Sequence, residues 1–323
     1  MSEPTQEADR EGLFCYNLPN LPKVWDSTMF GLLKECPRKF QYVILEGWQP
    51  RGFAAHLAFG IAYHKALEIF DHHRSAGMGY DEAQIEAVKF CMSYGERKPD
   101  GTFTAYDSFF TNEPNKVRHT LVRSVIWYLE EFRNDTLTTV QRRDGTPAVE
   151  LSFKLNLQLQ SPDGDPFALA GHLDRLVEDD SGHLWFLDRK TTKNEINARY
   201  WSQFNPNNQM SLYYFATQSI LHKPARGGII DAVQIGVTFS RYRRNTIYMT
   251  RGQQEEWLAD TNIYLNLAQS FALNDYWPKN DKSCGNYGGC PFQVICSRDP
   301  KVRSEFIKHE GFYKRHWNPL ENR

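Results

Sequence analysis

The hydrophobic pattern predicts a long strand near the middle of the chain. Apolar residues occupy alternate positions from Val149 to Leu159, and mostly polar or charged residues separate them. A period of two is typical of a strand with one buried face. Two more strands are predicted at 167–177 and 184–190, on either side of the turn sequence Asp179-Asp180-Ser181-Gly182. These two strands are expected to pair as a hairpin.

Helical spacing of apolar residues predicts most of the other elements. The segment Ser27–Tyr42 opens with a serine and a threonine suited to an N-cap, and Pro37 should end or restart its helix just after Cys36. Further elements are expected at about 57–73, 207–221 and 253–273 (helices), 81–133 (broadly helical), and 232–240 and 246–250 (strands). This order of elements predicts an α/β fold with a mixed central sheet.

Length and composition are those of a globular protein. The chain has 323 residues, of which 41% are hydrophobic and 24% charged, and no linker-like segment interrupts it. We expect a flexible N-terminal segment at 1–25 and one domain at 26–323, with a helical insertion at about 80–145. The polar opening and the lack of any apolar run of about 18 residues predict a cytoplasmic protein without signal peptide or membrane span.

The charge balance bears on nucleic-acid binding. A net charge of −1 argues against a protein that coats nucleic acid, because such binding uses many Lys and Arg residues. An enzyme needs only a local basic path. The candidates are Arg175 and the basic residues Arg241, Arg243 and Arg244, between which Tyr242 is placed. A solvated charged face explains this basic run equally well.

Two carboxylates and a lysine form the candidate catalytic group. Asp188 and Lys190 are two apart on a predicted strand, so their side chains share a face, while Arg189 points the other way. A hairpin centred on Ser181 sets Asp174 opposite Asp188. Such a carboxylate pair requires a cation. Mg²⁺ or Mn²⁺ on these carboxylates, with a lysine beside them, is the arrangement that metal-assisted phosphodiester hydrolysis uses.

Three other polar residues lie on predicted helices. His64 has Leu57, Ile61 and Leu67 at helical spacing, so it is either a metal ligand or a histidine satisfied within the core. Gln209 and Tyr213 are four apart and share a helix face. They form either a packing stripe or a pair that contacts the substrate or the lysine.

Four of the six cysteines predict a metal site. Cys36 lies near the start of the chain, and Cys284, Cys290 and Cys296 lie near its end. Without a secretion signal, metal ligation is a better explanation than disulfides. The five-residue spacings are wider than those that zinc favours, and the Cys-Pro sequences at Cys36 and Cys290 resemble iron–sulfur ligation. We therefore favour a [4Fe–4S] cluster over zinc.

The ordered motifs resemble the RecB-like branch of the PD-(D/E)XK nuclease superfamily. They are Gly60-x-x-x-His64, Gly171-x-x-Asp174-Arg175, Asp188-x-Lys190-Thr191-Thr192 and Gln209-x-x-x-Tyr213. Cys36 and the three late cysteines are similar to those of its iron–sulfur members: the small CRISPR-associated exonucleases, the AddB nuclease domain and phage relatives. The resemblance spans Ser27 to about Arg298, and it implies a restriction-endonuclease-like core with a C-terminal iron–sulfur clamp.

The resemblance also implies a role for each residue. His64, Asp174, Asp188 and the backbone carbonyl of Arg189 would be the metal ligands, and Lys190 the catalytic lysine. Gln209 and Tyr213 would complete the catalytic set, and Glu150 matches an acidic position whose role is less defined. The implied activity is exonuclease action on single-stranded or end-exposed DNA, with recombination, repair or CRISPR-adaptation proteins as candidate partners.

Two alternatives remain open at this point. The first is a catalytically silent DNA-binding or assembly module on the same fold, against which the complete set of His, Asp, Asp and Lys argues. The second is a zinc-stabilised interaction protein, which would be colourless and lack metal-dependent activity.

Overall fold

The chain forms two compact units, each assembled from segments that are distant in the sequence. The computed structural model describes residues 12–51, 55–97, 103–105 and 113–321. Unit 1 comprises Met1–Gly52, Phe153–Gly171 and Arg251–Asn322, and unit 2 comprises Phe53–Ser152, His172–Thr250 and Arg323. Because both units draw on several segments, the sequence carries no linker that would mark a boundary between them.

A mixed sheet forms the centre of the fold, as the sequence predicts. Its strands are ordered β1-β7-β8-β9-β10, and β5 and β6 also pair with β7. Neighbours are parallel in β1/β7 and β8/β9 and antiparallel in β5/β7, β7/β8 and β9/β10. The strand bounds are Val24–Trp25 (β1), Thr138–Thr139 (β5), Val149–Gln160 (β6), Pro166–Glu178 (β7), Leu184–Thr192 (β8), Ala225–Ile235 (β9) and Ser240–Tyr248 (β10).

Gly171 in β7 gives room for an aromatic ring. A Cβ atom at this position would lie 2.8 Å from the Cζ atom of Phe153 on β6, closer than real Cβ contacts come. The glycine of the second motif therefore has a packing explanation.

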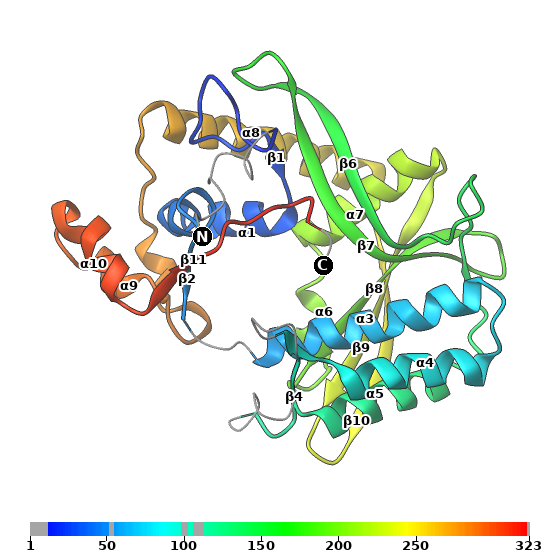
Figure 1. Ribbon diagram of the computed structural model, residues 1–323. Helices are drawn as coiled ribbons and strands as arrows, with labels where there is room; N and C mark the ends of the chain where they lie inside the picture. The colour runs from blue at the N-terminus through cyan, green and yellow to red at the C-terminus, as the bar shows by residue number, and fades with distance from the viewer. Residues whose placement is uncertain (1–11, 52–54, 98–102, 106–112, 322–323) are drawn as a thin grey trace. The chain divides into compact units, whose positions relative to one another are not determined.

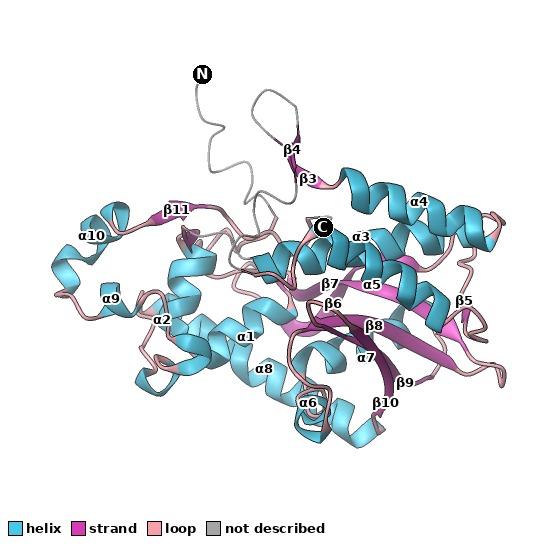
Figure 2. Cartoon of the chain, turned by 90° about the horizontal axis from the view of Figure 1, so that it is seen from below, coloured by secondary structure: helices cyan, strands magenta, loops and turns pink. Residues whose placement is uncertain are grey.

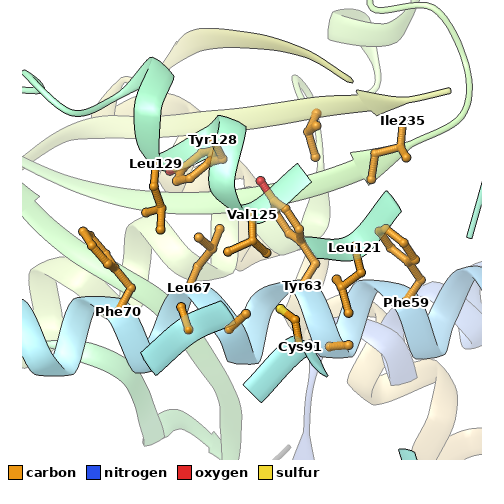
Figure 3. Packing of buried hydrophobic residues seen from close by; sticks show 14 of the residues in the cluster. Phe59, Tyr63, Leu67, Phe70, Cys91, Leu121, Val125, Tyr128, Leu129 and Ile235 are labelled. Carbon is orange, nitrogen blue, oxygen red and sulfur yellow. The ribbon is translucent and has the colours of Figure 1, made fainter. Parts of the chain in front are cut away.

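Helices cover both faces of the part of the sheet that belongs to unit 2 (Figure 2). The helices α3 (Ala55–Ser75), α4 (Tyr80–Ser93) and α5 (Arg118–Glu131) run side by side (Figure 1). Figure 3 shows their shared apolar core, in which Tyr63, Leu67, Leu121 and Val125 are almost completely buried. The other face is covered by α7 (Asn208–Leu221), which follows the short helix α6 (Ala198–Ser202).

Unit 1 contains the first and last helices of the chain. Its N-terminal segment forms α1 (Ser27–Glu35), α2 (Pro37–Phe40) and a π-helical turn (Gln41–Leu45). Its C-terminal segment forms α8 (Arg251–Leu273), the 3₁₀ turns Asp281–Ser283, Asn286–Gly288 and Pro300–Val302, and the helices α9 (Gln293–Cys296) and α10 (Arg303–His309). The strands β2 (Trp48–Pro50) and β11 (Phe312–Lys314) pair antiparallel. In unit 2, a small hairpin joins β3 (Gly95–Arg97) to β4 (Phe103–Ala105).

Several predicted boundaries need correction. The expected flexible segment at 1–25 is wrong for residues 12–25, because Leu13, Leu21 and Trp25 are buried and Val24–Trp25 form β1, while 1–11 lie outside the described residues. The N-cap of α1 is Asp26, whose Oδ1 accepts a hydrogen bond from the Met29 N–H (2.8 Å). This aspartate precedes the serine and threonine that suggested the cap.

The predicted strands at 232–240 and 246–250 are also misplaced. The structure has one long hairpin, in which Ala225–Ile235 pairs with Ser240–Tyr248. The reason is that β9 contains, directly after Ala225, an Arg-Gly-Gly sequence that favours a loop, and β10 contains a basic run that resembles an exposed turn. Pairing with β8 on one side and β10 on the other overrides this local preference.

Candidate active site

The hairpin of β7 and β8 carries both predicted catalytic carboxylates. Arg175 pairs with Leu187, which is the register expected for a turn centred on Ser181. Continued by one position, this register sets Asp174 opposite Asp188. Local turn chemistry and the alternation of side chains therefore suffice to predict this half of the site.

Asp188, Lys190, Gln209 and Tyr213 form a continuous polar chain. The Lys190 Nζ donates to Asp188 Oδ1 (2.9 Å) and to Gln209 Oε1 (3.0 Å), and Gln209 Nε2 donates to the Tyr213 hydroxyl (3.1 Å). Asn207 caps α7 by accepting from the Gln209 N–H (2.9 Å), so the helix begins where this chain needs it. The structure thus brings together four of the predicted residues and relates the Gln–Tyr pair to the lysine.

His64 reaches Asp174 and not the hydrophobic core. Its Nδ1 lies 3.2 Å from Asp174 Oδ2, and its side chain is 31% exposed. Ile61, on the helix face expected to be apolar, is 43% exposed. The same Asp174 oxygen accepts a hydrogen bond from the backbone N–H of Arg189 (2.7 Å). His64 therefore lies among the site residues, which favours the ligand interpretation over the core one.

Opposite charges and burial shift the pKa values of the site in different directions. Burial acts to raise the pKa of Asp174, but His64 and Lys190 outweigh it and hold that pKa well below its ordinary value. For Asp188, burial is the larger influence and raises the pKa despite the nearby Lys190. Burial opposes the charged imidazole of His64, yet Asp174 raises its pKa. Asp174 is thus the more readily ionised carboxylate of the pair.

Three further residues belong to this neighbourhood. Burial raises the pKa of Glu150 to about 7, and the charges of Asp174 and Glu68 add to the effect. The φ angle of Glu150 is +45°, a left-handed conformation that non-glycine residues rarely adopt and that occurs often at functional sites. Burial and the charge of Asp188 raise the pKa of Tyr200 on α6. Neither Glu68 nor Tyr200 belongs to one of the sequence motifs, although Glu68 follows His64 by one helical turn.

The carboxylates of Asp174 and Asp188 and the imidazole of His64 are suitable ligands for a divalent cation, although ion pairs within the protein occupy them here. Among the described residues, no group of three or more His, Cys, Asp or Glu side chains is arranged to hold a metal ion. Here Lys190 and His64 neutralise the two aspartates. Asp188 Oδ2 is buried, and it forms an ion pair with Lys190 Nζ (2.8 Å). A buried carboxylate oxygen of this kind, with Asp174 and an imidazole, fits Mg²⁺ or Mn²⁺ chemistry.

The arginines predicted to bind nucleic acid fall into two groups. Arg175 donates to Thr139 Oγ1 (2.8 Å) and is 16% exposed, and Arg244 is bound to Asp231 and Asp135. Both guanidinium groups form ion pairs with aspartates of the protein. By contrast, Arg241 stacks over the Phe239 ring (4.7 Å), and Arg243 donates to the backbone carbonyl of Tyr242 (3.0 Å). We keep Arg241 and Arg243 as candidates for DNA contact.

The four predicted cysteine ligands are free thiols of unit 1 that influence one another. Burial raises the pKa of Cys290, and the nearby Cys284 and Cys36 raise it further. Burial likewise raises the pKa of Cys296, with further contributions from Cys36 and Cys290. The backbone N–H of Asn280 donates to Cys36 Sγ (3.4 Å). An N–H···S contact of this kind suits a metal-bound thiolate.

Comparison with protein families identifies the superfamily. The profile of the PD-(D/E)XK nuclease superfamily matches residues 28–297, most of the chain. The chain belongs to this superfamily. PD-(D/E)XK proteins are nucleases that generally use divalent metals such as Mg²⁺ or Mn²⁺, so membership supports a nuclease with DNA as its substrate. The mixed sheet with its helices is consistent with a PD-(D/E)XK core.

Other comparisons are less informative. No curated protein matched the sequence. A proposed exonuclease from Eubacterium rectale has a similar structure, with 9% sequence identity and a TM-score of 0.44 over 88% of this chain and 92% of that one. The protein SSO0001 has 11% identity and a TM-score of 0.31 over 76% and 97%. Within the described part of the chain, no helix has the length and apolar character needed to cross a membrane.

Replacing His64 should affect metal use more than folding. We expect His64→Ala to raise the Mn²⁺ concentration for half-maximal cleavage about tenfold, because loss of a ligand weakens binding of the metal ion. The melting temperature should change little, since the side chain is partly exposed. Unchanged Mn²⁺ dependence together with a large fall in melting temperature would favour a structural histidine. His72→Ala, on the same helix and 47% exposed, is the control.

Proposed function

We propose that this protein is a Mg²⁺- or Mn²⁺-dependent deoxyribonuclease, an exonuclease acting on single-stranded or end-exposed DNA. The observation that carries the proposal is the convergence of His64, Asp174, Asp188 and Lys190 from three elements on one site. Superfamily membership supports the reaction class. The preference for free ends rests on the motif resemblance alone.

Each residue of the candidate site would have a separate role in phosphodiester hydrolysis. Asp174, Asp188, His64 and the backbone carbonyl of Arg189 would hold the cation, which would polarise the phosphate and lower the pKa of water. Lys190 would orient the attacking water and offset phosphate charge. Gln209 keeps the lysine ammonium in place by accepting its hydrogen bond (3.0 Å), and the Tyr213 hydroxyl fixes Gln209 (3.1 Å).

We also propose that Cys36, Cys284, Cys290 and Cys296 hold a structural [4Fe–4S] cluster. Support comes from the contact between the Asn280 N–H and Cys36 Sγ (3.4 Å). Cys290 and Cys296 also border an apolar cluster with Phe292 and Ile295. Such surroundings exclude water from sulfur ligands, which would stabilise a cluster.

A cleavage assay tests the function. We expect purified protein to degrade end-labelled DNA with Mg²⁺ or Mn²⁺ and to be inactive with EDTA, because the carboxylates alone cannot activate water. Single-stranded, blunt and covalently closed circular substrates in parallel distinguish end-dependent from internal cutting. Cleavage of closed circles at the rate of linear DNA would contradict exonuclease action. Absence of cleavage with either metal, in a protein that still binds DNA, would favour the catalytically silent module.

A further inference from the structure

A single buried carboxylate links the three elements that carry the candidate site. Asp71 lies on α3 and is 3% exposed. Its Oδ2 accepts a hydrogen bond from Arg189 Nη2 on β8 (2.7 Å), and its Oδ1 lies 3.5 Å from Arg175 Nη1 on β7. All three residues belong to unit 2. One side chain therefore connects α3, β7 and β8.

Each residue of this cluster is directly related to a site residue. Arg175 follows Asp174 in sequence, and Arg189 lies between Asp188 and Lys190. The backbone N–H of Arg189 itself donates to Asp174 Oδ2 (2.7 Å).

The helix gives Asp71 a fixed relation to His64. The two residues are seven positions apart on α3, so they lie on the same face at a separation of about 10 Å along the axis. The helix is thus attached to the hairpin at two points, through His64–Asp174 and through Asp71–Arg189.

Burial shows that these arginines act within the protein. Arg189 is 3% exposed, its guanidinium lies 5.6 Å from the centre of the Tyr128 ring, and its Nε lies 3.4 Å from the Tyr128 hydroxyl. Burial opposes the charged guanidinium, but Asp71 outweighs this and raises the pKa of Arg189 well above its ordinary value. A residue in this position cannot contact DNA.

Packing alone does not require this ion pair. A protein is often equally stable when apolar residues of similar volume replace a buried ion pair. A gain in stability therefore does not explain the pair, whereas a role in specifying one geometry does. We propose that Asp71 is a positioning residue for the metal-binding site: it fixes α3 against β7 and β8 so that His64 meets Asp174. This inference rests on the proposed function and extends it to a residue outside the superfamily motifs.

Metal binding without catalysis is the direct test. Mn²⁺ affinity is measured by the electron paramagnetic resonance signal of free Mn²⁺ in titrations of the full-length wild-type protein and Asp71→Asn. We expect the Asp71→Asn Kd to rise about 10- to 100-fold, the range for loss of a residue that orients metal ligands. Because this variant leaves Arg189 without its partner, its melting temperature is measured as well.

A double variant keeps the test decisive if Asp71→Asn does not fold. Asp71→Leu combined with Arg189→Met removes both charges and leaves the backbone of Arg189 in place. We expect a folded protein with a wild-type melting temperature and the same weakened Mn²⁺ binding. Wild-type Mn²⁺ affinity in this folded variant would overturn the proposal. A wild-type protein that binds Mn²⁺ but never cleaves DNA would refute the nuclease function instead.

Asp26→Ala is the control for general destabilisation. Asp26 is also buried, at 4% exposed, and it accepts hydrogen bonds from the Met29 N–H (2.8 Å) and from Trp317 Nε1 (2.9 Å). It belongs to unit 1, whereas Asp71 and the site residues belong to unit 2. We expect a lower melting temperature with Mn²⁺ affinity within twofold of wild type. An equal loss of affinity in Asp26→Ala and Asp71→Asn would assign Asp71 a merely structural role.

Discussion

Asp188→Asn is expected to reduce DNA cleavage by about 10²–10³-fold or more without lowering the melting temperature. The loss follows because stabilisation of the transition state depends on a positioned charge, and the asparagine cannot replace the carboxylate as a cation ligand. Stability should be kept because burial raises the pKa of Asp188, so ionised Asp188 is less favourable in the folded protein than in the unfolded chain at neutral pH. Initial cleavage rates and thermal melts of both proteins check the two parts.

Lysine variants provide the matched comparison. Lys190→Met should be as inactive as Asp188→Asn, since Lys190 contacts both Asp188 and Gln209. Lys193→Met should stay within about twofold of wild type, because Lys193 is 64% exposed and its nearest acidic partner, Glu113, is 3.9 Å away. Full activity of purified Lys190→Met would remove Lys190 from the catalytic group.

Replacing any one of the four clustered cysteines is expected to remove the iron and the brown colour. Cys36→Ser should also lower solubility and melting temperature by a large amount, since a cluster bound by Cys36 and Cys284 would close a very long loop and restrict the unfolded chain. Iron, acid-labile sulfide and zinc are measured after anaerobic purification. About four irons per chain are expected, and one zinc without iron would contradict the cluster.

Cys15 and Cys91 serve as internal controls for this experiment. Cys15 and Cys91 are almost completely buried, at 2% and 0% exposed, and burial raises the pKa of both thiols. Cys91 belongs to the apolar core of α3, α4 and α5. Alanine is therefore the suitable replacement, and Cys15→Ala and Cys91→Ala should keep full iron content.

Local patterns in the sequence predict the central part of the site well. Alternation along β8 puts Asp188 and Lys190 on one face, and the turn at Ser181 sets the register with β7. Both are short-range consequences of strand geometry, and the structure agrees: Lys190 contacts Asp188, and Arg175 pairs with Leu187. The role of His64 was open in the sequence because helical spacing alone does not reveal what faces the helix.

The remaining features depend on contacts that no short pattern encodes. No sequence pattern distinguishes Asp71 from an exposed aspartate on a helix, and its partner Arg189 is distant in the chain. Arg175 and Arg244 resembled surface cations because composition does not distinguish a paired arginine from a solvated one. The strands of the long β9–β10 hairpin were misplaced in the prediction, because the glycines in β9 and the basic run in β10 do not have the pattern of a strand. Each of these required knowledge of the partner strand or helix.

The interleaving of the two units sets an order for folding during synthesis. Every described residue of unit 2 has been translated once the ribosome has passed Thr250, so the helices and strands that carry His64, Asp174 and Lys190 can pack before the chain is complete. Unit 1 cannot be completed until α8 and the segments after it appear. The first α-helix therefore lacks its packing partner α8 until then, and Cys36 is translated long before Cys284, Cys290 and Cys296.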